Sequence, residues 1–209
     1  MRALLVLAFA ISLLAAVPAQ AQGQSASDTT GRLAVGTVTG LTGPASAWAG
    51  GVPRALTLGG TVHRGETLRT LDGAKLAVRF TDGSELILGA DSQASIDTFA
   101  PAQGNAALRL VRGILRVVIE RARSWRRFEV ETVSAVAAAR STEWVVALDP
   151  SDATAVFTVS GRVAVRAEGE TVTLAAGDGT DVPAGEPPGA VKRWGQARVD
   201  RVLAATTLP

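Results

Sequence analysis

The stretch over residues 65–96 constrains the fold most, because apolar spacing and turn residues agree within it. Apolar residues alternate with polar or small ones from Leu76 to Phe80, Asp82-Gly83 interrupts, and the alternation resumes at Leu86. Period-two alternation around an Asp-Gly turn predicts a β-hairpin. The remainder of the chain repeats this rhythm of short apolar runs and turns, which predicts an all-β domain.

The loop length of this hairpin decides which residues face each other. A two-residue turn would set Arg79 opposite Leu86, whereas a three-residue loop that ends with Gly83 at positive φ sets Val78 opposite Leu86. We predict the second register, because it gathers the apolar side chains on one buried face. A later apolar stretch, residues 108–119, predicts two strands around a kink at Gly113.

The two ends of the chain differ from this β pattern. Residues 1–21 carry one charge, an apolar run of 15 residues and an A-x-A cleavage pattern, which is typical of a signal peptide. The run is shorter than the ~20 residues that span a bilayer, and an uncleaved anchor is the alternative. Residues 22–31 are polar and predict a flexible leader, residues 32–185 the all-β domain, and residues 186–209 a tail with a short amphipathic helix. We expect export to the periplasm, or secretion, with no stable membrane span after cleavage.

The C-terminal helix has two possible roles. Val191, Trp194, Val202 and Leu203 fit a period of 3.6 residues, with basic residues mostly on the other side. We expect the helix to cover an open sheet edge rather than to lie on a membrane surface.

Catalytic chemistry finds little support in the sequence. There is no cysteine, and His63 is the only histidine, so it would have to serve any His-based triad or metal site. No nucleophile elbow surrounds it. Most acidic residues lie beside glycine or proline, where aspartate caps turns. We therefore expect no enzyme activity, no cofactor and no metal site.

One segment is strongly basic. Its arginines gather around Trp125, and a single acidic residue, Glu120, opposes them. We name as the candidate partner surface Arg116, Arg121, Arg123, Trp125, Arg126 and Arg127. It could meet an acidic protein face or an anionic polymer, and a solvated strand face is the alternative. The whole chain is nearly neutral, with 21 basic and 19 acidic side chains, so we expect no nucleic acid partner.

Two short motifs, Asp82-Gly83 and the segment from Arg140 to Trp144, stand out along the chain. Together with the strand pattern around them, they resemble the FecR domain, the periplasmic domain of bacterial iron-responsive signal transducers. The resemblance spans about residues 36–183. The residues that carry its signature are Asp82, Gly83, Arg140, Ser141, Thr142 and Trp144. The sequence departs from the Arg-Gly-Thr-x-Phe signature at Ser141 and Trp144. If the family needs glycine there for positive φ, serine costs about 1 kcal/mol or shifts the turn.

The resemblance implies an all-β domain of stacked short hairpins, related to a β-solenoid, without catalytic activity. It implies a binding module for an envelope protein, such as a transporter signalling domain or an anti-sigma protein, in envelope signalling. The alternative is a scaffold module that binds glycan or peptidoglycan through an exposed Trp48 or Trp125. A further hypothesis for protein binding is strand addition at an exposed sheet edge.

Overall fold

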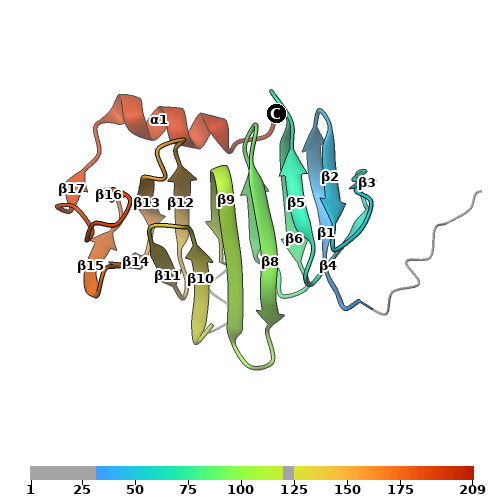
Figure 1. Ribbon diagram of the computed structural model, residues 1–209, viewed down its shortest axis with the longest axis horizontal. Coiled ribbons are helices and arrows are strands. Elements are labelled where there is room, and N and C mark those ends of the chain that lie inside the picture. The colour runs from blue at the N-terminus through green and yellow to red at the C-terminus, as the bar shows by residue number, and fades with distance from the viewer. Residues whose placement is uncertain (1–31, 120–124) are drawn as a thin grey trace, which may run out of the picture. The chain divides into compact units, whose positions relative to one another are not determined.

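The computed structural model describes residues 32–119 and 125–209, and Arg32–Pro209 forms one compact unit. The predicted signal peptide and leader lie outside the described residues. The unit is built almost wholly from short strands in two sheets, with one helix across the upper ends of the strands in Figure 1. The prediction of a mostly β fold with a short C-terminal helix is confirmed. Within the described residues, the strands form open sheets.

Sheet A contains nine strands in a row. In spatial order they are β4 (Thr61–His63), β1 (Ala34–Thr42), β6 (Lys75–Phe80), β7 (Glu85–Leu88), the second half of β9 (Asn105–Val118), β12 (Glu143–Leu148), β13 (Thr154–Ser160), β16 (Asp178–Val182) and β17 (Lys192–Arg193). All of these pairings are antiparallel. Three of these pairings, β6–β7, β12–β13 and β16–β17, join strands that follow each other in the chain, and the others join strands further apart in sequence.

Sheet B has the same number of strands. In spatial order they are β3 (Arg54–Ala55), β2 (Ala45–Trp48), β5 (Thr67–Thr70), β8 (Gln93–Ala100), the first half of β9, β10 (Arg127–Glu131), β11 (Val136–Ala139), β14 (Arg162–Ala167) and β15 (Glu170–Ala175). The pairing of β9 with β10 is parallel, and the others are antiparallel. Sheet B is therefore mixed.

Strand β9 belongs to both sheets. The residues up to Arg112 pair with β8 and β10, whereas those from Gly113 onward pair with β7 and β12. Gly113 has φ of 83°, and a Cβ there would lie 2.7 Å from Cα of Ser92. The predicted kink at Gly113 is confirmed, but the two predicted strands are one continuous strand, β9, whose halves pair in different sheets. Glycine permits this bend by having no side chain.

The central hairpin confirms the predicted register. Val78 lies opposite Leu86 and Leu76 opposite Leu88, and Gly83 has φ of 93°. All four of these apolar side chains are buried.

The two sheets enclose one apolar core. A column of aromatic rings crosses it from sheet A through sheet B and back, with ring centroids 4.6 to 5.8 Å apart. Its members are Phe80, Phe99, Trp125, Phe128 and Trp144. All five side chains are at most 3% exposed. Such contacts add about 0.5–1.5 kcal/mol per pair to the burial of area, so this column joins the layers at the middle of the unit.

The C-terminal helix α1 spans Gln196–Ala205 and begins later than the apolar pattern suggested. Lys192–Arg193 instead forms β17, which pairs with β16 at one edge of sheet A. The expectation that the helix itself covers a sheet edge was therefore wrong. Its C-terminal end reaches the start of β6, where Nζ of Lys75 donates to the carbonyl oxygens of Ala204 and Thr207 at 2.6 Å each. A cation here also complements the negative end of the helix dipole. Within the described residues, no helix has the length and apolar character to cross a membrane.

Candidate binding surfaces

The predicted arginine surface is divided between two faces of the unit. Arg121 and Arg123 lie outside the described residues. Arg116 lies in the sheet A half of β9 and forms an ion pair with Glu143. Arg126 and Arg127 are exposed at the start of β10 in sheet B. Because the sheets pack face to face, the described arginines of this group do not point in one direction.

Arg127 forms an ion pair with a residue of its own strand, β10. Its Nε lies 2.5 Å from a carboxylate oxygen of Glu129. This hydrogen bond, together with the charge of Glu129, raises the pKa of Arg127 above its usual value. The guanidinium therefore stays cationic, with one carboxylate already beside it.

Trp125 is not an exposed aromatic residue. Its side chain is 3% exposed and packs between Phe99 and Phe128 in the aromatic column. Its indole Nε1 donates to Oδ2 of Asp82 at 2.9 Å. The expectation that Trp125 could stack on a sugar or meet an anionic polymer was therefore wrong. Its charged neighbours in sequence suggested a surface, but the ring fills the space between the sheets.

Asp82 fixes the central hairpin with both carboxylate oxygens. Oδ1 accepts hydrogen bonds from the backbone N–H and the hydroxyl of Ser84, at 3.2 and 2.7 Å, and Oδ2 accepts the bond from Trp125. The first two bonds form an Asx-type turn. The signature residue Asp82 therefore ties a turn of sheet A to the core.

The second signature segment also has a structural role. Ser141 does not adopt positive φ, so the expected backbone cost does not arise. Thr142 is buried, and its hydroxyl donates to the carbonyl oxygen of Arg162 at 3.1 Å. Trp144 is fully buried against Phe128. Among the signature residues of this segment, Arg140 is the charged one, and it is exposed.

His63 belongs to a buried electrostatic cluster. Its Nδ1 lies 3.5 Å from Oε1 of Glu66, whose side chain is only 2% exposed. Glu66 also accepts hydrogen bonds from the Arg54 guanidinium, the shortest at 2.8 Å, and from the backbone N–H of His63 at 2.9 Å. A buried carboxylate needs this degree of compensation. Among the described residues, no group of three or more potential ligands could hold a metal ion.

Sequence reasoning missed a basic strip on the outer face of sheet B, which we call the edge strip. It consists of Arg140, Arg162 and Arg166, which are exposed and make no ion pair within residues 32–119 and 125–209. Small residues lie between these arginines, and a depression of about 390 Å³ includes Arg140, Arg162 and Thr173. The arginines are separated in sequence and become neighbours only through strand register, so no local pattern could reveal them.

Strand β15 is an open edge next to this strip. It pairs with β14, and within the described residues it has no partner on its other side. Its outward-facing side chains, Thr171, Thr173 and Ala175, are exposed, whereas Leu174 is buried. The strand has the unpaired row of backbone groups that strand addition requires.

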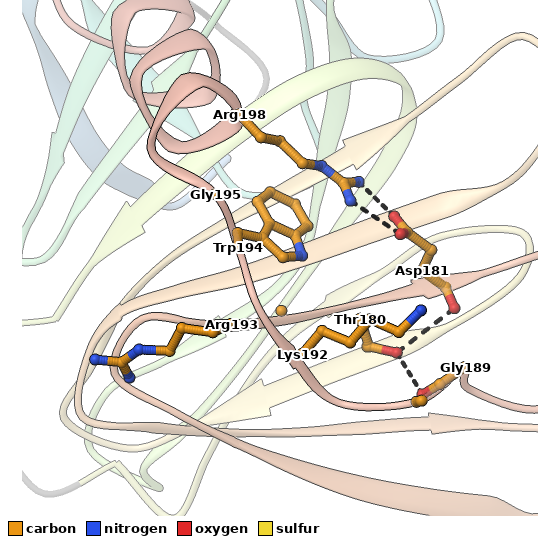
Figure 2. A pocket seen from close by; sticks show the side chains of 10 residues that line it. Thr180, Asp181, Gly189, Lys192, Arg193, Trp194, Gly195 and Arg198 are labelled. Atoms are coloured by element: carbon orange, nitrogen blue, oxygen red, sulfur yellow. Dashed lines mark hydrogen bonds and ion pairs between the residues drawn. The ribbon is translucent and has the colours of Figure 1, made fainter.

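A small pocket of about 230 Å³ lies where the C-terminal segment meets sheet A (Figure 2). Arg198 lies over the ring of Trp194, 3.5 Å from its centroid, and forms a paired hydrogen bond with Asp181 at 2.9 and 2.5 Å. Trp194 in turn stacks on Phe157 at 5.1 Å. These groups satisfy one another, so the pocket anchors α1 to sheet A.

A wider groove of about 630 Å³ crosses the outer face of sheet A beside the last four residues of the chain. Its charged side chains are already paired: Arg79 with Glu85 at 2.6 Å, and Arg116 with Glu143. The edge strip differs from this groove, because no ion pair within the described residues matches its three arginines.

Comparison with known proteins matches part of the chain to a family. Residues 66–164 match the model of the family described as FecR protein. Two solved structures of a protein from Parabacteroides distasonis ATCC 8503, provisionally described as an anti-sigma factor, share the fold, with TM-scores of 0.56 and 0.55 and 18% identity in each case. Each match covers 66% of this chain and 64% or 63% of the other, which is less than two thirds of those chains. The search of curated proteins gave no match. The chain therefore carries a FecR domain, with residues 66–164 as the matched segment.

Proposed function

We propose that this chain is a non-enzymatic protein-binding module of the cell envelope that acts in signalling. The observation that carries the proposal is the FecR domain at residues 66–164. The provisional description of the matched solved structures as anti-sigma factors supports a regulatory setting and a protein partner. The signal-peptide pattern at residues 1–21 supports a periplasmic location.

The arrangement of polar groups favours binding over catalysis. His63 and Glu66 belong to a buried cluster with Arg54, and Asp82 holds a turn and an indole. These titratable groups already serve the fold. The open edge of β15 and the edge strip supply, by contrast, backbone and charge that nothing in the described part of the chain satisfies.

In-cell crosslinking tests the proposal. The tagged full-length chain is crosslinked in living cells, the periplasmic fraction is isolated, and the attached proteins are identified by mass spectrometry. We expect an outer-membrane transporter or an inner-membrane anti-sigma protein. Recovery of wall or polysaccharide-export components alone would contradict the signalling role. Sequencing of the mature N-terminus in the same fraction would show whether cleavage follows Ala21.

A further inference from the structure

We propose that β15 receives an extended segment of the partner protein, and that this segment alternates apolar and acidic residues. This inference rests on the proposed function, because it specifies the partner of a protein-binding module. The added strand would continue sheet B, with its apolar side chains beside Val172 and Leu174 and its carboxylates on the same face as the edge strip. Backbone pairing would supply affinity and the carboxylates specificity.

The backbone of β15 is oriented for such pairing. Ala167 and Glu170 close a two-residue turn whose central residues, Glu168 and Gly169, have φ of 45° and 80°. The closing pair of such a hairpin is hydrogen-bonded, and pairs then alternate along an antiparallel ladder. Val172 and Leu174 therefore bond to β14.

Thr171 and Thr173 consequently direct their N–H and C=O groups to the open side. An independent observation agrees, because the N–H of Ala175, two residues further on, donates to Oδ2 of Asp178 at 3.1 Å and not to β14. Asp178 thus closes one end of the edge. The open stretch begins just before it, at Thr173.

The other sheet edges are protected against strand addition. β3 has two residues and follows Pro53, β17 has two residues that are both basic, and β4 has three residues. Short length, proline and charge are the usual means of blocking an edge. β15 has six residues and contains neither proline nor a basic residue. Strand addition is therefore best accommodated at β15.

The charge of the neighbouring strand specifies what is added. Arg162 lies opposite Ala175 and Arg166 opposite Thr171, so both arginines flank the row of small outward-facing residues on β15. The residues opposite them on β15 are threonine and alanine, which offer no anion. Carboxylates at alternate positions of an added strand would lie about 10 Å from the backbone of β14, a distance that long arginine and carboxylate side chains span together.

A second copy of the chain matches this surface less well. Antiparallel pairing of two β15 strands would bring Thr171, Thr173 and Ala175 of the other copy to the outer face. None of them is acidic, so the edge strip would remain unmatched. Charge complementarity therefore favours an acidic segment of a different protein.

Peptide binding tests the proposal with the full chain. The probes are a ten-residue peptide of alternating valine and aspartate and its counterpart with asparagine, both measured by fluorescence anisotropy at low salt. We expect the aspartate peptide to bind about three- to tenfold more tightly, as a few exposed ion pairs allow. The double variant Arg162→Ser/Arg166→Ser should remove this difference. Arg109→Ser is the matched control, since Arg109 on the same face already pairs with Asp97 at 3.0 Å.

Thr173→Pro tests the backbone contribution. Proline removes an N–H that the ladder to β14 does not use, so the fold should persist while binding of both peptides is lost. Thr173→Val keeps the N–H and should bind like the wild type. Equal binding of the two peptides, unchanged binding by Thr173→Pro, or absence of binding would overturn the proposal. So would a dimer of the chain that Thr173→Pro dissociates.

The in-cell experiment separates this proposal from the proposed function. If the wild type and Thr173→Pro capture the same signalling partner equally well, the proposed function stands and the strand-addition site is wrong. If neither captures a signalling partner, the proposed function itself is wrong. Capture by the wild type but not by Thr173→Pro supports both.

Discussion

Two hairpins of this protein share their local chemistry but differ in their surroundings. The β6–β7 hairpin and the β14–β15 hairpin each combine alternating apolar residues with a turn that contains an acidic residue and a glycine. In the first, β1 and β9 pair with the outer sides, and Asp82 ties the turn to Trp125. In the second, β15 has no outer partner in the described residues. A Cβ added at Gly169 in its turn would have no atom within 4 Å.

This difference indicates a division of roles. The first hairpin is enclosed on both sides and contributes to the core, whereas the second ends a sheet and offers backbone groups. The same short-hairpin unit therefore serves stability at one place and, in our proposal, recognition at another. Substitutions in the first hairpin should mainly change the free energy of unfolding, and substitutions in the second should mainly change binding.

The largest contrast is expected between Leu86→Ala and Thr173→Ala. Leu86 is 1% exposed, so truncation should lower the free energy of unfolding by about 2–5 kcal/mol through lost burial and a residual cavity. Thr173 is exposed at the edge, and its truncation should change stability by no more than about 0.5 kcal/mol. Urea denaturation measures both values. Equal losses would remove the distinction between the hairpins.

Two glycine turns give a more controlled comparison. Gly161 and Gly169 have nearly the same φ, 81° and 80°. A Cβ at Gly161 would lie 2.7 Å from the Thr142 hydroxyl, whereas nothing lies within 4 Å of one at Gly169. We expect Gly169→Ala to cost about 1–2 kcal/mol for backbone strain alone and Gly161→Ala about 1–3 kcal/mol more for overpacking. Thermal unfolding of both variants would test this. Similar losses of stability would contradict a clash between the new Cβ at position 161 and Thr142.

Asp82 tests how the first hairpin is attached to the core. Asp82→Ala should destabilise the protein by about 1–3 kcal/mol, because it leaves the buried indole N–H of Trp125 without an acceptor and removes the Ser84 turn. Asp82→Asn keeps one acceptor oxygen for the hydrogen bonds to both Ser84 and Trp125, so its free energy of unfolding should lie between those of the wild type and Asp82→Ala. Denaturation followed by Trp fluorescence measures the series. If Asp82→Asn were as stable as the wild type, the two-sided role of the carboxylate would be wrong.

The sequence predicted the features that local rules decide. The register of the β6–β7 hairpin followed from loop length and the apolar face, and the mostly β class followed from the spacing of turns. The kink at Gly113 was predicted, but the continuation of β9 through it into the other sheet was not, because that passage depends on strands far away in sequence.

The candidate surfaces were harder to predict for the same reason. Trp125 was placed at the surface because arginines surround it in sequence, whereas its acceptor Asp82 lies 43 residues away. The edge strip joins arginines from β14 with Arg140, and cross-strand register alone makes them neighbours. Periodicity within a single strand contains no information of this kind.

The smallest expected effect is a pH dependence of stability from Asp149, which lies in the turn between β12 and β13. Hydrogen bonds from the Ser151 side chain, then from the backbone N–H groups of Ala153 and Ser151, lower the pKa of Asp149. A lowered pKa in the folded state stabilises the fold above the ordinary aspartate pKa, and this contribution is lost as the pH falls through the folded value. Ser151→Ala should raise the pKa of Asp149 toward its usual value in an NMR titration. An unchanged pKa would show that the backbone bonds suffice.

Amide hydrogen exchange along β15 tests the central claim most directly, because the claim is that this strand has an open side. In the free, full-length protein, we predict protected N–H groups at Val172 and Leu174 and rapid exchange at Thr171 and Thr173. Residue-resolved exchange by NMR gives all four rates in one experiment. Alternating rates would establish the open edge that strand addition requires. Equal protection of all four would mean that β15 is already paired on both sides, and the account of β15 as the recognition edge would be wrong.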